Sequence, residues 1–273
     1  MKENHSRRWV YGVDFSGAKD AGRRIWIATG SIRGKKLEIT DCRPAKELPG
    51  SGRELQKSLV GLTDFISGQR EAIFGMDFPF GLPESIVGAK NWKDFVLSFR
   101  KRFSDPKRFK EECFAAGHNK ELPRTTDREQ KTPFSPYNLW LYKQTYYGIR
   151  EVIDPLIRED KASFLPMQKL ANGKPWVVEI CPAVTLKRED LYSSYKGKTP
   201  ECCNQRLMIL AKLVEIGNLR ISPRLEEKIL NNADGDALDS VIAAFATFRN
   251  LPNLFSSPVT RNSIYNKEGY VYA

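Results

Sequence analysis

Hydrophobic and polar residues form strand-like patterns in three short segments near the start of the chain. Segments 9–14 (WVYGVD) and 23–32 (RRIWIATGSI) are rich in β-branched and aromatic residues and flank a turn that contains glycine, which is typical of two strands. Segment 35–45 (KKLEITDCRPA) alternates apolar and polar residues and predicts a third strand. Because the connections between the segments are short, we expect an antiparallel meander.

A helix and two buried strands are predicted further along the chain. Residues 52–68 carry apolar side chains at helical spacing and end at Gly68. Segments 72–76 (AIFGM) and 176–181 (WVVEIC) are almost wholly apolar, which is typical of strands buried on both faces. We therefore expect both segments to be inner strands.

The rest of the chain is expected to be mostly helical. Residues 84–172 combine charged, aromatic-bearing helical stretches with a polar, proline-containing passage, which predicts an insertion of helices and a long loop within a single domain, 1–273. Further helices are expected over 201–217, 223–231 and 235–249, with a closing strand in the final GYVYA. This order of elements predicts an α/β fold in which helices flank a mixed sheet.

The composition limits the class of protein. No apolar run reaches the roughly 18 residues of a membrane-spanning helix, and the basic N-terminus continues directly into a strand-like segment, so we expect a cytoplasmic protein without a membrane partner. The net charge of +11 favours a polyanionic partner, nucleic acid first, although solubility alone is an alternative explanation. The oligomeric state does not follow from these features.

Cysteine and histidine are too sparse for several kinds of site. The five cysteines are scattered and include no C-x-x-C pair, which argues against a disulfide framework and a structural zinc site. The two histidines, His5 and His118, give little support to a histidine-rich metal site or a Ser-His-Asp triad. A bound metal is therefore expected to be a hard cation held by oxygen atoms.

Acidic residues stand at the ends of the predicted strands. Asp14 ends the first strand, Asp77 follows the fourth, and Glu179 lies in the fifth. A charge at the end of a buried strand loses solvation, so it is tolerated mainly when it is paired, protonated or bound to a metal. Asp14 and Asp77 have an alternative role in bracing turns, and Glu179 has one as the partner of a Lys or Arg of the insertion.

Two more aspartates lie on the last helix. Asp236 and Asp239 share one face at i, i+3, and Asp234 stands just before them. Asp234 and Asp236 fit positions that the helix dipole favours, whereas Asp239 lies one turn further in. Clustered carboxylates that bind Mg²⁺ or Mn²⁺ are able to support two-metal hydrolysis of a phosphodiester.

The turn after the first strand fits other kinds of site less well. Its glycines do not have Walker A or G-x-G-x-x-G spacing. Ser16 lacks a histidine partner and a G-x-S-x-G elbow. We therefore interpret Asp14 as the residue of interest in this turn.

Four motifs in this order resemble the domain-of-unknown-function 429 family of predicted nucleases: GVDFSGA, GMDFPFGLP, VVEICPAVT and NADGDALDSVIAAFATF. The resemblance spans nearly the whole chain. It implies an RNase H-like fold, with a five-stranded sheet of order 3-2-1-4-5 and a site at the carboxyl ends of strands one and four. The D-A-L-D helix is also similar to the final helix of RuvC-type junction resolvases.

The resemblance also implies roles for individual residues. It makes Asp14, Asp77, Asp236 and Asp239 catalytic ligands of Mg²⁺ (or Mn²⁺). Glu179 is a further catalytic acid, either a ligand or a base beside the metal site. The acid that RNase H carries on its first helix has no clear counterpart in 53–68. The metal set is therefore expected to be closer to that of the resolvases.

Basic residues are candidates for holding nucleic acid. They are Lys19 in the first turn together with Arg100, Arg102, Lys107, Arg108, Arg124 and Lys131, and the uncharged Ser16 in the same turn is a further candidate. For Phe99, Phe103 and Phe109, which alternate with these charges, packing in the core is the favoured interpretation. Arg124 and Lys131 are expected in a lid near the carboxylates or in an exposed loop.

The sequence thus predicts a divalent-metal-dependent nuclease. Two alternatives stay open: a nucleic-acid-binding protein on the same fold that does not cleave, and a nucleotide phosphohydrolase of the actin-like layout.

Overall fold

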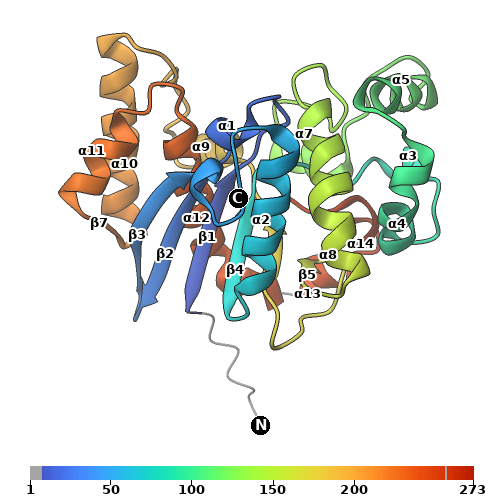
Figure 1. Ribbon diagram of the computed structural model, residues 1–273, viewed down its shortest axis with the longest axis horizontal. Helices are drawn as coiled ribbons and strands as arrows, with labels where there is room; N and C mark the ends of the chain where they lie inside the picture. The colour runs from blue at the N-terminus through green and yellow to red at the C-terminus, as the bar shows by residue number, and fades with distance from the viewer. Residues whose placement is uncertain (1–7, 256) are drawn as a thin grey trace.

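The protein is built on a mixed seven-stranded sheet with helices on both faces (Figure 1). The structure is a computed structural model that describes residues 8–255 and 257–273, so His5 lies outside the described residues. The strand order is β5-β6-β4-β1-β2-β3-β7. The strands are β1 (Trp9–Asp14), β2 (Trp26–Arg33), β3 (Lys36–Pro44), β4 (Ala72–Met76), β5 (Ser163–Leu165), β6 (Trp176–Glu179) and β7 (Leu219–Ile221).

The predicted meander is confirmed, because β1, β2 and β3 pair in sequence and antiparallel. On the other side of β1, strands β4, β6 and β5 run parallel to it, as expected for strands that return through helices. The α/β class with a mixed, helix-flanked sheet is therefore confirmed.

The expected number of five strands is wrong. Strands β5 and β7 have three residues each and extend the sheet at its two edges. Segments of this length are too short to show a periodicity in the sequence. The expected closing strand at the C-terminus is also corrected, since Val271 makes an isolated bridge to Glu179 and the flanking residues form no strand.

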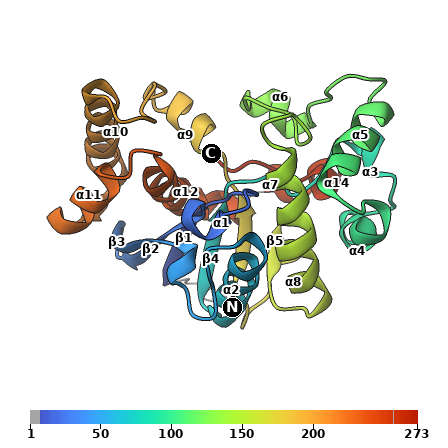
Figure 2. The same ribbon diagram turned by 45° about the horizontal axis from the view of Figure 1, so that its top comes forward.

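Helices cover the sheet on both sides, and Figure 2 shows the same elements from a second direction. They are α1 (Ala21–Arg24), α2 (Leu55–Gly68), α3 (Glu84–Val87), α4 (Trp92–Arg102), α5 (Pro106–Ala116), α6 (Thr125–Gln130), α7 (Tyr142–Tyr147), α8 (Asp154–Arg158), α9 (Pro182–Arg188), α10 (Pro200–Gly217), α11 (Pro223–Leu230), α12 (Asp236–Asn250), α13 (Ser257–Thr260) and α14 (Tyr265–Glu268). A π-helical turn, Gly148–Ile153, joins α7 to α8, and short 3₁₀ turns occupy Ala45–Glu47 and Leu251–Phe255. Within the described residues, no helix is both long enough and apolar enough to cross a membrane.

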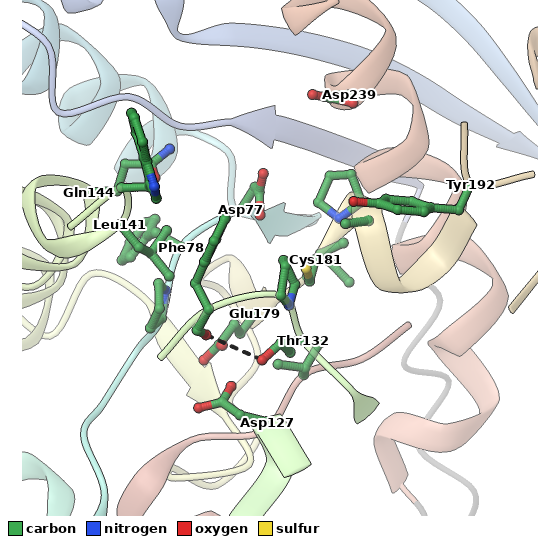
Figure 3. A pocket seen from close by; sticks show the side chains of 18 of the residues that line it. Asp77, Phe78, Asp127, Thr132, Leu141, Gln144, Glu179, Cys181, Tyr192 and Asp239 are labelled. Carbon is green, nitrogen blue, oxygen red and sulfur yellow. Dashed lines mark hydrogen bonds between the residues drawn. The ribbon is translucent and has the colours of Figure 1, made fainter. Parts of the chain in front are cut away.

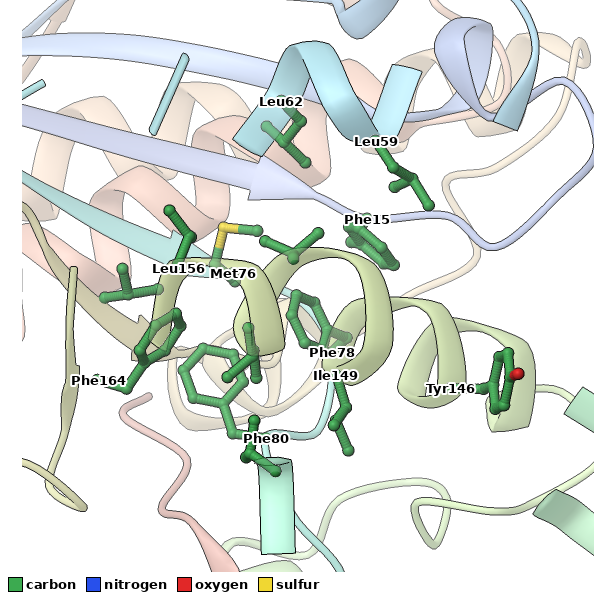
Figure 4. Close-up of a cluster of buried hydrophobic side chains, with 14 of the residues drawn as sticks. Phe15, Leu59, Leu62, Met76, Phe78, Phe80, Tyr146, Ile149, Leu156 and Phe164 are labelled. Atoms are coloured by element: carbon green, nitrogen blue, oxygen red, sulfur yellow. The ribbon is translucent and has the colours of Figure 1, made fainter. Parts of the chain in front are cut away.

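The alternation of side chains along the strands divides the interior into two cores. Tyr11 and Val13 of β1 lie in the core beneath α2 and the α7–α8 helices, whereas Val10 lies in the core beneath α12. Figure 4 shows the first core, where Phe78 and Phe80 lie close to Ile149 of the π-helical turn. The two faces of the sheet therefore carry different helices, and each strand residue is assigned to one face.

Two glycines allow α12 to approach the sheet closely. A Cβ atom at Gly12 of β1 would lie 2.0 Å from the carbonyl oxygen of Ser240, and one at Gly75 of β4 would lie 1.9 Å from the hydroxyl of Thr247. Neither position has room for a side chain. These contacts hold the middle of α12, from Ser240 to Thr247, against β1 and β4.

Helices α3 to α8 and the π-helical turn together account for about half of residues 84–172, where helices and a long loop were expected. The polar passage of this region is more ordered than predicted, because it contains α6 and its residues Arg124 and Asp127 are buried. Phe99, Phe103 and Phe109 are fully buried, which confirms that they belong to the core.

Candidate functional site

Two of the predicted acids end neighbouring parallel strands. Asp14 is the last residue of β1, and Asp77 directly follows β4. The register pairs Val13 with Met76, and the backbone N–H of Asp77 donates to the carbonyl of Val13 at 2.9 Å. Because adjacent strands lie about 4.8 Å apart, Asp14 and Asp77 are neighbours on the face of the sheet that α12 covers.

The other two aspartates come from the first turn of α12. Asp236 is its first residue and Asp239 lies three residues later, so both project from the same side of the helix end. The positive end of the helix dipole favours carboxylates in this turn. The close approach of α12 at Gly12 brings this turn towards Asp14.

The cluster is partly enclosed, because Asp14 and Asp239 are buried and Asp77 and Asp236 are half-buried. Burial, and after it the negative charge of Asp239, raises the pKa of Asp14 well above its ordinary value. The same two causes in the same order raise the pKa of Asp77 to about 8, and burial raises the pKa of Asp236 to about 6. These mutual effects show that the strand ends and the helix end converge on one place.

A lysine from a distant loop partly neutralises the cluster. The Nζ atom of Lys196 lies 2.6 Å from Oδ2 of Asp239, and the hydroxyl of Tyr195 donates to Oδ1 of Asp239 at 2.5 Å. The charge of Lys196 also opposes the rise in the pKa of Asp14 and Asp77. Burial by itself would lower the pKa of Lys196, but Asp239 and Asp14 raise it, so the lysine stays positively charged.

The loop that carries Tyr195 and Lys196 is held by a buried arginine. Arg206 of α10 donates to the carbonyl of Tyr195 at 2.7 Å and to the carbonyl of Gly197 at 2.9 Å. The N–H of Gly197 donates to the carbonyl of Ala233, just before α12, at 2.7 Å. The backbone on both sides of Lys196 is therefore fixed to α10 and to the start of α12.

The carboxylates of Asp14 and Asp77 accept no hydrogen bond within residues 8–255 and 257–273. Asp14 is buried and Asp77 is half-buried, and carboxylate oxygens without donors are the kind of ligand that hard divalent cations prefer. In the described part of the chain, however, no three His, Cys, Asp or Glu side chains are already arranged to hold a metal ion. The carboxylate oxygens are ligands that suit Mg²⁺ or Mn²⁺. As the side chains are placed, however, Asp239 contacts the ammonium group of Lys196.

Glu179 occupies a different environment from the aspartates. It ends β6, where Val177 faces the α2 side of the sheet, so Glu179 points to that side as well. The guanidinium of Arg124 donates to both of its carboxylate oxygens, at 2.5 and 2.8 Å, and the N–H of Phe80 donates to it at 2.9 Å. The alternative in which Glu179 pairs with a basic residue of the insertion is thus the observed arrangement, and neither role proposed for it at the metal site, ligand or base, has support in this geometry.

Arg124 is not part of an exposed lid, which corrects that expectation. It is buried and donates to Asp127 as well as to Glu179, with distances of 2.8 Å to Oδ1 and 3.0 Å to Oδ2 of Asp127. Its guanidinium is therefore enclosed by two carboxylates and is not available to a phosphate. Lys131, at the C-terminal end of α6, is exposed as expected.

Arg100 and Arg102 of α4 brace the protein instead of facing solvent freely. Arg100 donates to Asp154 at 3.0 Å and to Glu151 at 2.8 Å, so its charge is largely compensated. Arg102 donates to the carbonyl of Val87 at 2.8 Å. Both guanidinium groups are therefore already engaged by acceptors of the protein and are not free to bind a phosphate.

Of the other four candidates, Lys19, Lys107 and Arg108 are exposed and Ser16 is half-buried. Lys107 and Arg108 of α5 pair along their helix with Glu111 at 3.8 Å and Glu112 at 2.7 Å, respectively. Lys19 is exposed in the turn after β1, and the hydroxyl of Ser16 in this turn accepts a hydrogen bond from the N–H of Ala18 at 3.3 Å. Of these candidates, Ser16 and Lys19 are the nearest to Asp14 along the chain.

A cavity of about 400 Å³ opens beside the carboxylates (Figure 3). Asp77, Asp239 and Lys196 line its polar side. Figure 3 shows Asp77 between Tyr192 on one side and Phe78 and Leu141 on the other. The apolar lining includes Phe78, Phe134, Trp140, Leu141 and Tyr192.

Several residues of this site were not predicted from the sequence. Lys196 and Tyr195 lie in the loop LYSSYKGKTP, and Trp140 and Tyr192 carry large exposed rings at the cavity. Trp140 stands between Leu139 and Leu141 in an apolar stretch, so nothing in the local sequence marks its ring as exposed. Nothing in the local sequence connects Lys196 to Asp239, because 43 residues separate them and the contact depends on the packing of α10 and α12.

Comparisons of the chain with protein-family models, with curated proteins and with solved structures gave no match.

Proposed function

We propose that this protein is a divalent-metal-dependent nuclease that hydrolyses phosphodiester bonds of nucleic acid. The observation that carries the proposal is the pair of carboxylates at neighbouring strand ends, Asp14 and Asp77, which lack hydrogen-bond donors among the described residues and face the acids of α12. Asp14, Asp77 and Asp239 would hold the metal, with Asp236 beside them. The net charge of +11 favours the approach of a nucleic acid.

An RNase H-like fold and membership of the domain-of-unknown-function 429 family are part of this proposal. The five inner strands have the order β3-β2-β1-β4-β6, which agrees with the order 3-2-1-4-5 that the resemblance implies. The three antiparallel strands and the parallel pair β1–β4 agree with it as well. The D-A-L-D motif begins α12, next to the carboxyl end of β1.

The residues of the chain contribute ligands, orientation and charge. Bound Mg²⁺ or Mn²⁺ would activate the attacking water and stabilise charge on the phosphate. The chain holds Asp14 and Asp77 rigidly at the ends of buried strands, and the hydroxyl of Tyr195 orients Asp239. Lys196 keeps positive charge at the cluster, and it must give up part of its contact with Asp239 when a cation binds.

Glu179 and Arg124 contribute in another way. Their pairing ties the end of β6 to α6, and Arg124 also donates to the carbonyl of Glu268 at 3.2 Å. Arg124, Asp127 and Glu179 all line the cavity, so this contact fixes part of its wall. We therefore propose that Glu179 and Arg124 hold the elements around the site in place and do not contact the metal or the substrate.

The test is cleavage of labelled single-stranded and double-stranded DNA and RNA in Mg²⁺ or Mn²⁺. We expect the wild-type protein to cleave and a chelator to abolish the cleavage. The Asp14→Asn variant should not cleave, although its circular dichroism spectrum should be unchanged. Asp64→Asn is the matched control, since Asp64 is exposed on α2. Equal cleavage by Asp14→Asn and the natural sequence would refute the assignment.

The Lys196–Asp239 pair favours one second candidate, a nucleic-acid-binding protein that does not cleave. In that case the lysine is the permanent counter-ion of the cluster, consistent with the lack of a preformed metal group among the described residues. Such a protein would bind nucleic acid in a salt-sensitive manner and show no cleavage in any divalent metal.

A further inference from the structure

Three large aromatic side chains at the cavity beside the carboxylates are unusually exposed. Trp140 is 76% exposed, Tyr192 is 56% exposed and Phe134 is 40% exposed. They come from two separate segments, one between α6 and α7 and one between α9 and α10. Rings of this size are normally covered in a folded protein, so their gathering at one cavity indicates a binding surface.

The cavity also contains a polar group without a partner. The hydroxyl oxygen of Ser193 is buried and has no hydrogen-bond partner within the described residues, and Ser193 lines the cavity. A buried hydroxyl without a partner costs free energy that a ligand with donors or acceptors would recover. The ligand therefore has a flat apolar body, to match the rings, and polar edges.

The charges at the cavity favour a ligand that is joined to a phosphate. Lys196 lines the cavity, and the Nζ atom of Lys187 lies 5.1 Å from the centre of the Tyr192 ring. Asp77 and Asp239, the metal ligands of the proposed function, line the same cavity. A phosphate bound through metal at these carboxylates would thus have the aromatic rings directly beside it.

We propose that this cavity holds an unpaired nucleobase next to the phosphate that is cleaved, and that the nucleic acid recognised is therefore single-stranded or locally unpaired. This inference rests on the proposed nuclease function. A base has two flat faces for Trp140 and Tyr192 and polar edges for Ser193. Stacking on aromatic side chains is the common way in which proteins hold single-stranded nucleic acid.

A fully paired duplex does not fit this arrangement. Its bases are stacked on one another and hydrogen-bonded to the opposite strand, so a base reaches a protein cavity only after it leaves the stack. That step costs free energy in a duplex and little in a single strand. The cavity therefore confers a preference for unpaired nucleotides, which is independent of their sequence because every base has a π-face.

Binding to the Asp14→Asn variant in Mg²⁺ tests this inference without cleavage. The probes are a short single-stranded DNA of mixed sequence, the blunt duplex of the same sequence, and the same single strand carrying the fluorescent adenine analogue aminopurine. In this background, Trp140→Leu and Tyr192→Leu are each expected to weaken binding of the single strand about tenfold and to change binding of the duplex much less. Aminopurine fluorescence is expected to be quenched on binding, and Trp140→Phe is expected to restore most of the affinity.

Leu139→Ala is the matched control. Leu139 is 60% exposed and precedes Trp140 in the chain, but it does not line the cavity. We expect its affinity for both DNA forms to be unchanged. Unchanged single-strand affinity in Trp140→Leu and Tyr192→Leu, or an equal loss for single strand and duplex, would overturn the inference.

Two further outcomes separate this inference from the proposed function. If the natural sequence cleaves nothing but the aromatic variants lose single-strand binding selectively, the base site stands and the nuclease assignment fails. If the natural sequence cleaves single strands and blunt duplexes equally and Trp140→Leu has no effect, the nuclease stands and the base site fails. Competition by a free mononucleotide with the affinity of the single strand would assign the cavity to free nucleotides and overturn the inference.

Discussion

The ammonium group of Lys196 lies 2.6 Å from a carboxylate oxygen of Asp239, and the second oxygen of Asp239 accepts a hydrogen bond from Tyr195. The helix-end acid is thus held by two neighbouring residues of one loop. Asp14 and Asp77 on the strands receive only the longer-range field of the same lysine. A divalent cation at this cluster therefore competes with Lys196 for Asp239 and finds Asp14 and Asp77 without other donors in the described chain.

Removal of the lysine charge is expected to strengthen metal binding. In Lys196→Met, the apolar stem is kept and the competing cation is lost, so the affinity for Mn²⁺ should rise at least several-fold. Isothermal titration calorimetry with Mn²⁺ measures this change. The exposed Lys198→Met, two residues away, is the control and should bind Mn²⁺ as the natural sequence does. A lower Mn²⁺ affinity in Lys196→Met would contradict the competition.

The raised pKa of Asp77 predicts how stability changes with pH. The ordinary pKa is 3.8 and the folded value is about 8, so between these values the folded state keeps a proton that the unfolded state has lost. The contribution of Asp77 to the free energy of unfolding of the protein therefore falls as pH rises through this window. Asp77→Asn removes this dependence on pH. As pH rises from the lower to the upper end of the window, the free energy of unfolding of Asp77→Asn should therefore increase by at least ~1 kcal/mol relative to that of the wild-type protein.

Urea unfolding at several pH values, without divalent ions, measures the effect of Asp77→Asn. A difference between the two proteins that does not change with pH would refute the shifted pKa. Added Mg²⁺ should stabilise the natural sequence most near the upper end of the window, where Asp77 ionises, and should stabilise Asp77→Asn less.

Arg124 is expected to matter for stability and not for metal binding. Arg124→Met leaves Glu179 and Asp127 buried without their cation, which should lower the free energy of unfolding by about 3–5 kcal/mol. Arg128→Met, on the exposed side of the same helix, should change it by no more than about 0.5 kcal/mol. Adding Glu179→Gln to Arg124→Met should recover part of the loss. A Mn²⁺ affinity that falls strongly in folded Arg124→Met would indicate that Glu179 takes part in metal binding.

Gly12 is expected to control the distance between α12 and the sheet. Gly12→Ala places a methyl group against the backbone of Ser240 and Ala244, so the helix must move and the protein should lose about 2–3 kcal/mol of stability. Thermal and urea unfolding measure the loss, and cleavage should fall with it because Asp239 moves away from Asp14. Gly68→Ala, at the open end of α2, is the control and should be tolerated. If Gly12→Ala had unchanged stability, α12 would lie further from Gly12 than the structure shows, and the prediction would be wrong.

Local patterns in the sequence were sufficient for the elements that build the site. The alternation in 35–45, the apolar run 72–76 and the helical spacing of the D-A-L-D segment each depend on neighbours along the chain, and each predicted element is present. The acids at the strand ends were identified for the same reason, because an ionisable group in an apolar run is visible without a fold. The two edge strands, β5 and β7, were not predicted, because a segment of three residues is too short to show the alternation of a strand.

The sequence by itself determined which acids stand at strand and helix ends, while the tertiary structure decided which of them meet. Asp14, Asp77 and Glu179 all follow apolar strands, but the register pairs Met76 with Glu179, so Glu179 turns to the opposite face from Asp14 and Asp77 and meets Arg124. That register, the contact of Lys196 with Asp239 and the aromatic cavity arise from packing between distant segments. Side-chain alternation is a local property of each strand, whereas its phase relative to another strand is set by how the strands and helices pack together.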